Sequence, residues 1–161
     1  MVTVKIEIKE HLAEYVRGRY NDCKDGPVTF PSHSDLYVQI WDLLSKRPVN
    51  APVDRGNLEI NLPYRSFGKN PDYYNYLSKH SVNLLSKSIE ALLYSELHDR
   101  IRRRQIARHP LEMRNIKETI YEFQDEYCIY SLSHDAFYKE YYRMRQKERY
   151  RRKMMKKGKK I

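Results

Sequence analysis

The chain has 161 residues, 40% of them hydrophobic and 32% charged, and its formal net charge is +10 at pH 7. This length predicts one domain, or one domain with a small appendage, and is sufficient for a hydrophobic core without disulfide or metal staples. No apolar run reaches the length that spans a membrane. We therefore expect a soluble, folded protein.

Two segments have the alternation of apolar and polar residues that is typical of β-strands. The first covers residues 2–8, and the second covers residues 57–62 and ends at Pro63. Two isolated strands are marginal in water, so we expect them to pair with each other and to lie on helices. No other segment predicts a strand.

Three helices are expected before residue 109. The first covers residues 12–20 and ends at Gly18 or in the loop 21–26. The second is capped by Ser32 or Ser34 and ends before Pro48. The third covers about residues 78–107, and it offers a seam for a homodimer. Its apolar positions recur at spacings of three and four, and they are Val82, Leu85, Ile89, Leu92, Leu93, Leu97 and Ile101.

The last two helices are expected over about residues 111–127 and from Ser133 into the C-terminal tail. Ser133 is a suitable N-cap, and Leu132 and Phe137 have the spacing of a hydrophobic staple. The short connection between the helices is typical of a helix–turn–helix. The predicted fold is mainly α with a small two-stranded β element. Residues 1–109 would form an α-rich scaffold, and residues 110–161 a helix–turn–helix-like unit with a basic extension.

All of the net charge lies in the tail. Residues 143–160 contain eleven basic residues and a single acid, Glu148, whereas the rest of the chain contains 20 basic and 20 acidic residues. A neutral body with one concentrated basic arm favours a polyanionic partner, of which nucleic acid is the commonest. We expect residues 143–153 to extend the last helix and residues 156–160 to be disordered, because like charges repel.

The last helix carries side chains suited to a DNA major groove, where Arg and Gln can read base edges while Lys and Tyr contact phosphates. The alternative is a plain helix pair with a solvated outer face. Duplex DNA is the predicted partner. The candidate residues are His134, Tyr138, Lys139, Tyr142, Arg143, Arg145, Gln146, Lys147, Arg149, Arg151, Arg152 and Lys153.

A second basic cluster lies at the end of the long helix, with Asp99 as its one acid. Cations are favoured at a helix C-terminus by the helix dipole, which is the simpler explanation. Five arginines exceed what capping requires, so Arg102, Arg103 and Arg104 are candidates for a second phosphate-contacting patch. The cluster also contains Arg100 and Arg108.

Catalytic and cofactor motifs are absent from the sequence. There is no phosphate-binding glycine loop, no zinc-protease motif and no CxxC, and the six histidines have no metal-ligand spacing. Clustered tyrosines suggest phosphodiester cleavage, but the histidine pair that would hold the required metal is missing. We therefore predict a non-enzymatic protein without a cofactor. Cys23 and Cys128 could form a disulfide only if the fold brings them together, and no signal peptide precedes them, which favours the cytoplasm.

Residues 125–145, DEYCIYSLSHDAFYKEYYRMR, resemble the final segment of small proteins of bacterial phages and mobile elements that are described as DNA-binding. The strand at residues 57–63 and the following GKNPDYY resemble the same group more loosely. The resemblance implies a regulatory or architectural role on DNA, and it supplies no catalytic motif. Two alternatives remain open: an RNA-binding protein, since a basic arm with tyrosines suits structured RNA, and a protein–protein adaptor with an electrostatic tail.

Overall fold

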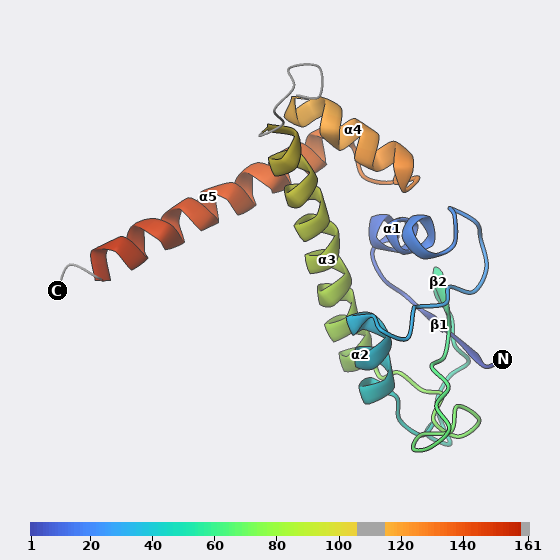
Figure 1. The fold of residues 1–161 in the computed structure, drawn as a ribbon. Helices are drawn as coiled ribbons and strands as arrows, with labels where there is room; N and C mark the ends of the chain where they lie inside the picture. The colour runs from blue at the N-terminus through green and yellow to red at the C-terminus, as the bar shows by residue number, and fades with distance from the viewer. Residues whose placement is uncertain (106–114, 159–161) are drawn as a thin grey trace. The chain divides into compact units, whose positions relative to one another are not determined.

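The computed structural model describes residues 1–105 and 115–158. It is mainly helical with one small sheet, as predicted (Figure 1). The described elements are β1 (Thr3–Ile6), α1 (Glu10–Tyr20), α2 (Asp35–Leu43), β2 (Leu58–Asn61), α3 (Lys79–Gln105), α4 (Ile116–Glu126) and α5 (His134–Gly158).

The chain packs as two units. Unit 1 contains Met1–Leu93 and Asp125–Ser131, and unit 2 contains Tyr94–Gln124 and Leu132–Ile161. The helix α3 contributes to both, so the division falls inside a helix. The predicted division between residues 109 and 110 therefore differs from the division of packing, and residues 106–114 lie outside the described residues.

The two predicted strands pair with each other in unit 1. They are antiparallel, with Val4 opposite Ile60 and Ile6 opposite Leu58, and all four side chains are buried. Val28 adds an isolated parallel bridge to Ile60, which the sequence did not predict because no alternation surrounds it. The sheet buries one face, as the alternation required.

The boundaries of the first two helices follow local sequence signals, except at Gly18 of α1. In α2, Ser34 is the N-cap and its hydroxyl accepts a hydrogen bond from the Tyr37 amide at 3.2 Å. In α1, Gly18 does not end the helix, which continues to Tyr20. A glycine is needed there because a Cβ would overlap the backbone of Tyr127.

A disulfide joins Cys23 to Cys128 in unit 1, with the Cα atoms 6.1 Å apart. Both residues have left-handed backbone conformations, with φ of 61° and 54°. Cys23 lies three residues after the end of α1, and Cys128 lies two residues after the end of α4. Beside the disulfide, Glu14 accepts hydrogen bonds from the Ser131 hydroxyl and amide at 2.5 and 3.1 Å. The fold therefore brings the two cysteines together, which the sequence left open, and the disulfide does not support the expectation of the cytoplasm.

The apolar residues of α3 are part of the protein's own hydrophobic core. Five of its residues, Leu85, Ile89, Leu93, Leu97 and Ile101, are at most 1% exposed. The seam that we expected for a homodimer is therefore occupied by the protein's own core. No described helix is long and apolar enough to cross a membrane.

Candidate nucleic-acid interface

The first turns of α5 are fixed in unit 2 by a cap and by buried rings. The Ser133 hydroxyl accepts a hydrogen bond from the Ala136 amide at 3.2 Å, so the predicted N-cap is confirmed. Phe137 and Tyr141 are buried. The Phe137 ring packs 6.2 Å from that of Tyr94, and the Tyr141 ring packs 4.8 Å from that of His98. These contacts set the direction in which the rest of α5 leaves the core.

The connection between α4 and α5 is also held in place. The Gln124 side chain is buried and donates a hydrogen bond to the Leu132 carbonyl at 2.8 Å. The Phe123 ring of α4 lies 6.5 Å from the Phe137 ring of α5, in an edge-on arrangement. The two helices thus form a packed pair, while a helix–turn–helix role for that pair stays a prediction.

Three of the candidate DNA-binding residues, His134, Tyr138 and Tyr142, form contacts within unit 2. The His134 ring stacks on Tyr121 at 3.8 Å, and its Nε2 lies 3.0 Å from the Lys117 carbonyl oxygen. The Tyr138 hydroxyl donates to the Tyr142 hydroxyl at 3.1 Å. His134 thus holds α5 on α4, while the Tyr138–Tyr142 bond lies within α5. For all three side chains, the predicted contact with DNA competes with contacts inside unit 2.

The same hydrogen bond bears on the chemistry of the tyrosines. Because Tyr138 donates its proton to Tyr142, its pKa is raised above the ordinary value. A phenol with a raised pKa is less readily ionised, and an ionised phenol is what attacks a phosphodiester. The hydrogen bond therefore does not activate Tyr138 as a nucleophile.

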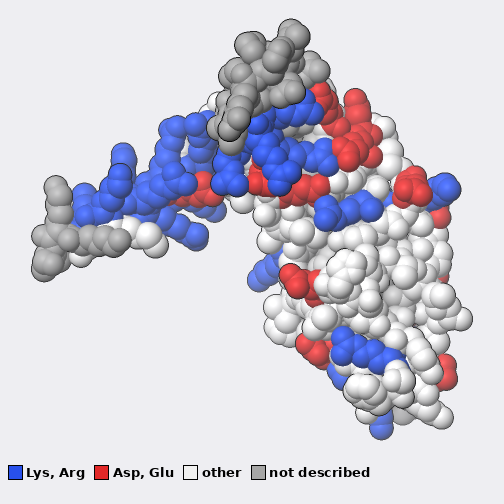
Figure 2. Space-filling view, viewed as in Figure 1, with Lys and Arg blue, Asp and Glu red and all other residues white. Residues whose placement is uncertain are grey.

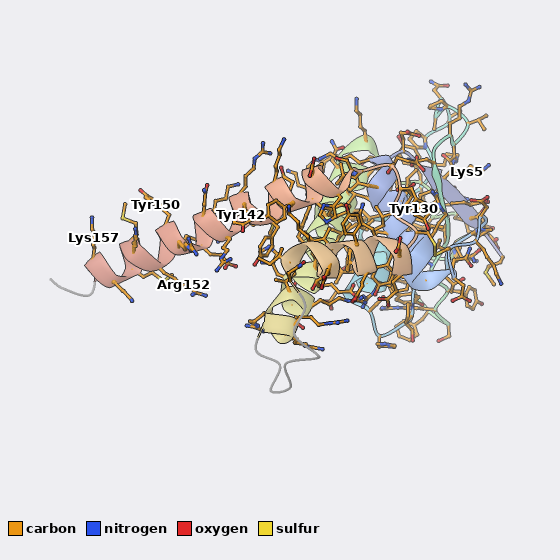
Figure 3. All side chains as sticks on the ribbon, turned by 90° about the horizontal axis from the view of Figure 1, so that it is seen from above. Lys5, Tyr130, Tyr142, Tyr150, Arg152 and Lys157 are labelled. Atoms are coloured by element: carbon orange, nitrogen blue, oxygen red, sulfur yellow. A yellow bond between two sulfur atoms is a disulfide. The ribbon has the colours of Figure 1, made fainter. Side chains whose placement is uncertain are left out.

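The outer half of α5, residues 146–158, is different in kind. Every residue in it is exposed, and it remains helical to Gly158 (Figure 1). The expected disorder of residues 156–158 is therefore wrong, while residues 159–160 lie outside the described residues. Lysine and arginine cover this segment in the space-filling view, and Arg152 and Lys157 project from the helix (Figures 2 and 3).

The cations of the outer half are not engaged in ion pairs, although Glu148 lies among them. Among residues 1–105 and 115–158, none of them forms an ion pair with a carboxylate. Successive residues of a helix are about 100° apart around its axis, so these side chains face every direction. They are Lys147, Arg149, Arg151, Arg152, Lys153, Lys156 and Lys157.

The remaining candidate residues of α5 have mixed environments. Lys139 and Gln146 are exposed, whereas Arg145 is half-buried. Arg143 is exposed but forms an ion pair with Glu140 one turn earlier. The run of cations that are both exposed and without a described ion pair therefore begins at Lys147.

The described arginines of the second basic cluster are all engaged in ion pairs with neighbouring acids. Arg102 and Arg103 both bind Asp99, at 2.9 and 2.7 Å, and Arg104 binds Glu122 of α4 at 2.7 Å. Arg100 binds Glu96 at 3.2 Å, and Arg108 lies outside the described residues. These arginines stabilise unit 2, which weakens their candidacy as a phosphate-contacting patch.

Sequence reasoning missed the residues of α4 that hold α5. Lys117 places its Nζ 5.6 Å from the Tyr138 ring centre, and Tyr121 carries the His134 ring. Their spacing of four places both on one face of a helix, which was a readable signal. Their partners on α5 were not readable, because the contact depends on how two helices pack.

No group of three or more metal-ligand side chains lies together within the described part of the chain. No protein-family model, curated protein sequence or solved structure matches this chain. The functional argument therefore depends on the geometry of α5.

Proposed function

We propose that the protein binds duplex DNA, and that the outer half of α5 is the element that contacts the phosphates. One observation carries the proposal: seven cations stand on an exposed helix without an acid partner among the described residues. A regulatory or architectural role in a phage or mobile element, as the sequence resemblance implies, belongs to the same proposal.

The charges of the outer half destabilise it when it is alone. Four pairs of cations are separated by four residues, and each such pair opposes the helix by about 0.2–0.5 kcal/mol. Phosphates placed between the cations would remove this repulsion. The pairs are Lys147 with Arg151, Arg149 with Lys153, Arg152 with Lys156, and Lys153 with Lys157.

A bare basic helix fits duplex DNA geometrically. An α-helix with its side chains is about 10–12 Å across, which matches a major groove about 12 Å wide. The outer half is about 20 Å long at 1.5 Å per residue. That length places its cations along the phosphates on both sides of the groove.

The adaptor alternative fits the outer half less well. A helix that docks in a protein groove needs apolar anchors along one face, at spacings of three, four and seven. Tyr150 and Met154 have the spacing of four, but the next position of that face is Lys157, and Met155 lies on another side. The segment therefore lacks an apolar face for a protein partner.

Fluorescence anisotropy of labelled duplex DNA at several salt concentrations tests the proposal. If about five tail cations contact phosphates, the slope of log affinity against log salt is about −4 to −5. The variant K147A/R149A/R151A/R152A/K153A should then lose most of that slope. No binding by the full chain near physiological salt would overturn the proposal.

A competition assay separates DNA from RNA. Unlabelled duplex DNA and duplex RNA of equal length compete with the labelled DNA for the full chain. The proposal expects DNA to compete more strongly, because the deep, narrow major groove of an RNA duplex does not admit a helix. Stronger competition by RNA would favour the RNA-binding alternative instead.

A further inference from the structure

A second surface with the chemistry of a nucleic-acid site lies in unit 1, and it contains none of the candidate residues of α3 and α5. It is formed by α2 and by the loop of residues 63–71 that follows β2. Residues 60–71 contain two basic and no acidic side chains. We call Tyr37, Trp41, Tyr64, Arg65 and Phe67 the α2–loop surface.

The loop is anchored along its length. Pro63 and Pro71 are buried at its two ends. The Lys69 ammonium donates to the carbonyl oxygens of Trp41 and Asp42 at 2.9 and 2.8 Å, where α2 ends. The Tyr37 hydroxyl donates to the Tyr64 carbonyl at 3.2 Å. The loop therefore holds its side chains in defined positions.

A glycine allows the loop to approach α2 closely. Gly68 has φ of +93°, and a Cβ there would lie 2.9 Å from an atom of the Trp41 ring. Both the left-handed conformation and the close approach require glycine. The sequence FGK thus places Phe67 and Lys69 on either side of a contact with Trp41.

Arg65 is positioned by two rings at once. Its guanidinium carbon lies 5.0 Å from the Trp41 ring centre and 5.6 Å from that of Tyr37. Stacking of this kind orients the planar group and leaves its N–H donors at the edge. No described carboxylate forms an ion pair with Arg65. The donors are available to an anion such as a phosphate.

Two aromatic side chains flank this arginine in the sequence and are directed to solvent. Tyr64 is 75% exposed and Phe67 is 80% exposed. Single exposed aromatics are ordinary, but here two lie on an anchored loop beside an unpaired cation. Aromatic rings for bases and a cation for the backbone are the combination used to bind single strands.

We propose that the α2–loop surface binds single-stranded nucleic acid, with bases stacked on Tyr64 and Phe67 and a phosphate on Arg65. Single strands are favoured over duplexes because the base faces of a duplex are already covered by their neighbours. An apolar protein partner would leave the Arg65 donors unpaired on burial. This proposal is independent of α5.

The sole tryptophan of the chain gives a direct readout. The full chain is titrated with unlabelled ten-nucleotide oligo-dT while Trp41 fluorescence is followed, at a salt concentration that releases duplex DNA from the tail. We expect a saturable change in Trp41 fluorescence. Substituting Tyr64→Ala or Phe67→Ala should weaken the affinity by about 5- to 100-fold.

A matched control comes from the same unit. Tyr130 is 71% exposed and lies outside the loop, so Tyr130→Ala should leave the titration unchanged (Figure 3). Arg65→Lys keeps the charge but loses the planar stack, and should weaken binding while the melting temperature shows that the variant is folded. Absence of a fluorescence change, equal affinities in the loop and control variants, or an equal response to a poly-glutamate peptide would each overturn the proposal.

Discussion

The two basic clusters of this protein look alike in the sequence and differ in the structure. Arg102 and Arg103 at the end of α3 are 75% and 76% exposed, yet both bind Asp99. Arg151 and Arg152 in α5 are also exposed, and no described carboxylate binds them. Exposure therefore does not distinguish the clusters. Glu148 stands three and four residues before Arg151 and Arg152, the same spacing as Asp99 to its two arginines, but among the described residues it forms no ion pair with them. The clusters therefore differ in which ion pairs form, and that difference decides which cations are free to bind a polyanion.

The first way to sharpen the comparison is to perturb the fold of unit 1, which contains neither cluster. The disulfide closes a loop with a sequence separation of 105, so C23S/C128S should lower the free energy of unfolding by about 4–5 kcal/mol. Urea denaturation measures the loss. The salt slope of DNA binding should be unchanged under conditions where the variant is folded. A changed slope would mean that the two properties are linked.

A second way is to add acids to the outer half of α5, whose sequence contains Glu148 as its only acid. In Q146E/M155E, the new carboxylates lie one turn from Arg149 and from Arg151 and Arg152. Neutralising about two phosphate contacts should reduce the salt slope by about 1.8 and lower the affinity at moderate salt by roughly tenfold. Anisotropy titrations measure both. The control is M155Q, in which residue 146 keeps its natural glutamine and both positions carry an uncharged residue of the size of glutamate. This control should bind like the natural chain.

The reverse change frees the α3 cluster. D99N/E122Q removes the partners of Arg102, Arg103 and Arg104 while it preserves side-chain size. We expect DNA affinity to increase by less than tenfold, because the freed arginines are fewer than the tail cations. The same titrations apply. Unchanged binding would show that pairing is not what distinguishes the clusters.

The smallest expected effect is a pH dependence at the base of α5. Burial lowers the pKa of His98, and Glu148 opposes that shift. The unfolded chain takes up a proton near pH 6.5 that folded His98 does not, so stability should fall as the pH drops through about 6.5. Well above pH 6.5, His98 is uncharged in both the folded and the unfolded chain, so it causes no further change in stability with pH.

Melting temperatures at pH 7.5 and 5.5 check this prediction. The natural chain should lose more stability on acidification than His98→Gln, which cannot titrate. Burial also lowers the pKa of His11 in unit 1. His11→Gln therefore removes a second histidine of this kind, and its melting temperatures are compared with those of His98→Gln. An acid-induced loss in His98→Gln equal to that of the natural chain would contradict the assignment.

Local chemistry made much of the fold predictable. The alternation in β1 and β2, the Ser34 and Ser133 caps and the apolar spacing in α3 each depend on neighbours in the sequence, and each is confirmed. The pairing of Asp99 with arginines three and four residues later was also readable. It was treated as a minor feature because one acid stood among five arginines.

The rest depends on contacts between distant segments. The Cys23–Cys128 disulfide, the bridge from Val28 to Ile60 and the Arg104–Glu122 ion pair each join segments that the sequence does not place together. Likewise, nothing on α5 alone indicates that His134 stacks on Tyr121. Sequence patterns identified which residues carry charge. Which charges remain free depends on ion pairs within one helix, such as that of Asp99 with Arg103, and on pairs between helices, such as that of Arg104 with Glu122.

The most direct test compares two matched pairs of arginines. R151A/R152A and R102A/R103A each remove two adjacent, exposed arginines from the C-terminal part of a helix, and the salt slope of duplex DNA binding is measured for both. The first variant should reduce the magnitude of the slope by about 1.8, and the second should leave it unchanged. Equal reductions, or a larger reduction in R102A/R103A, would contradict the claim that unpaired cations on α5 bind the DNA.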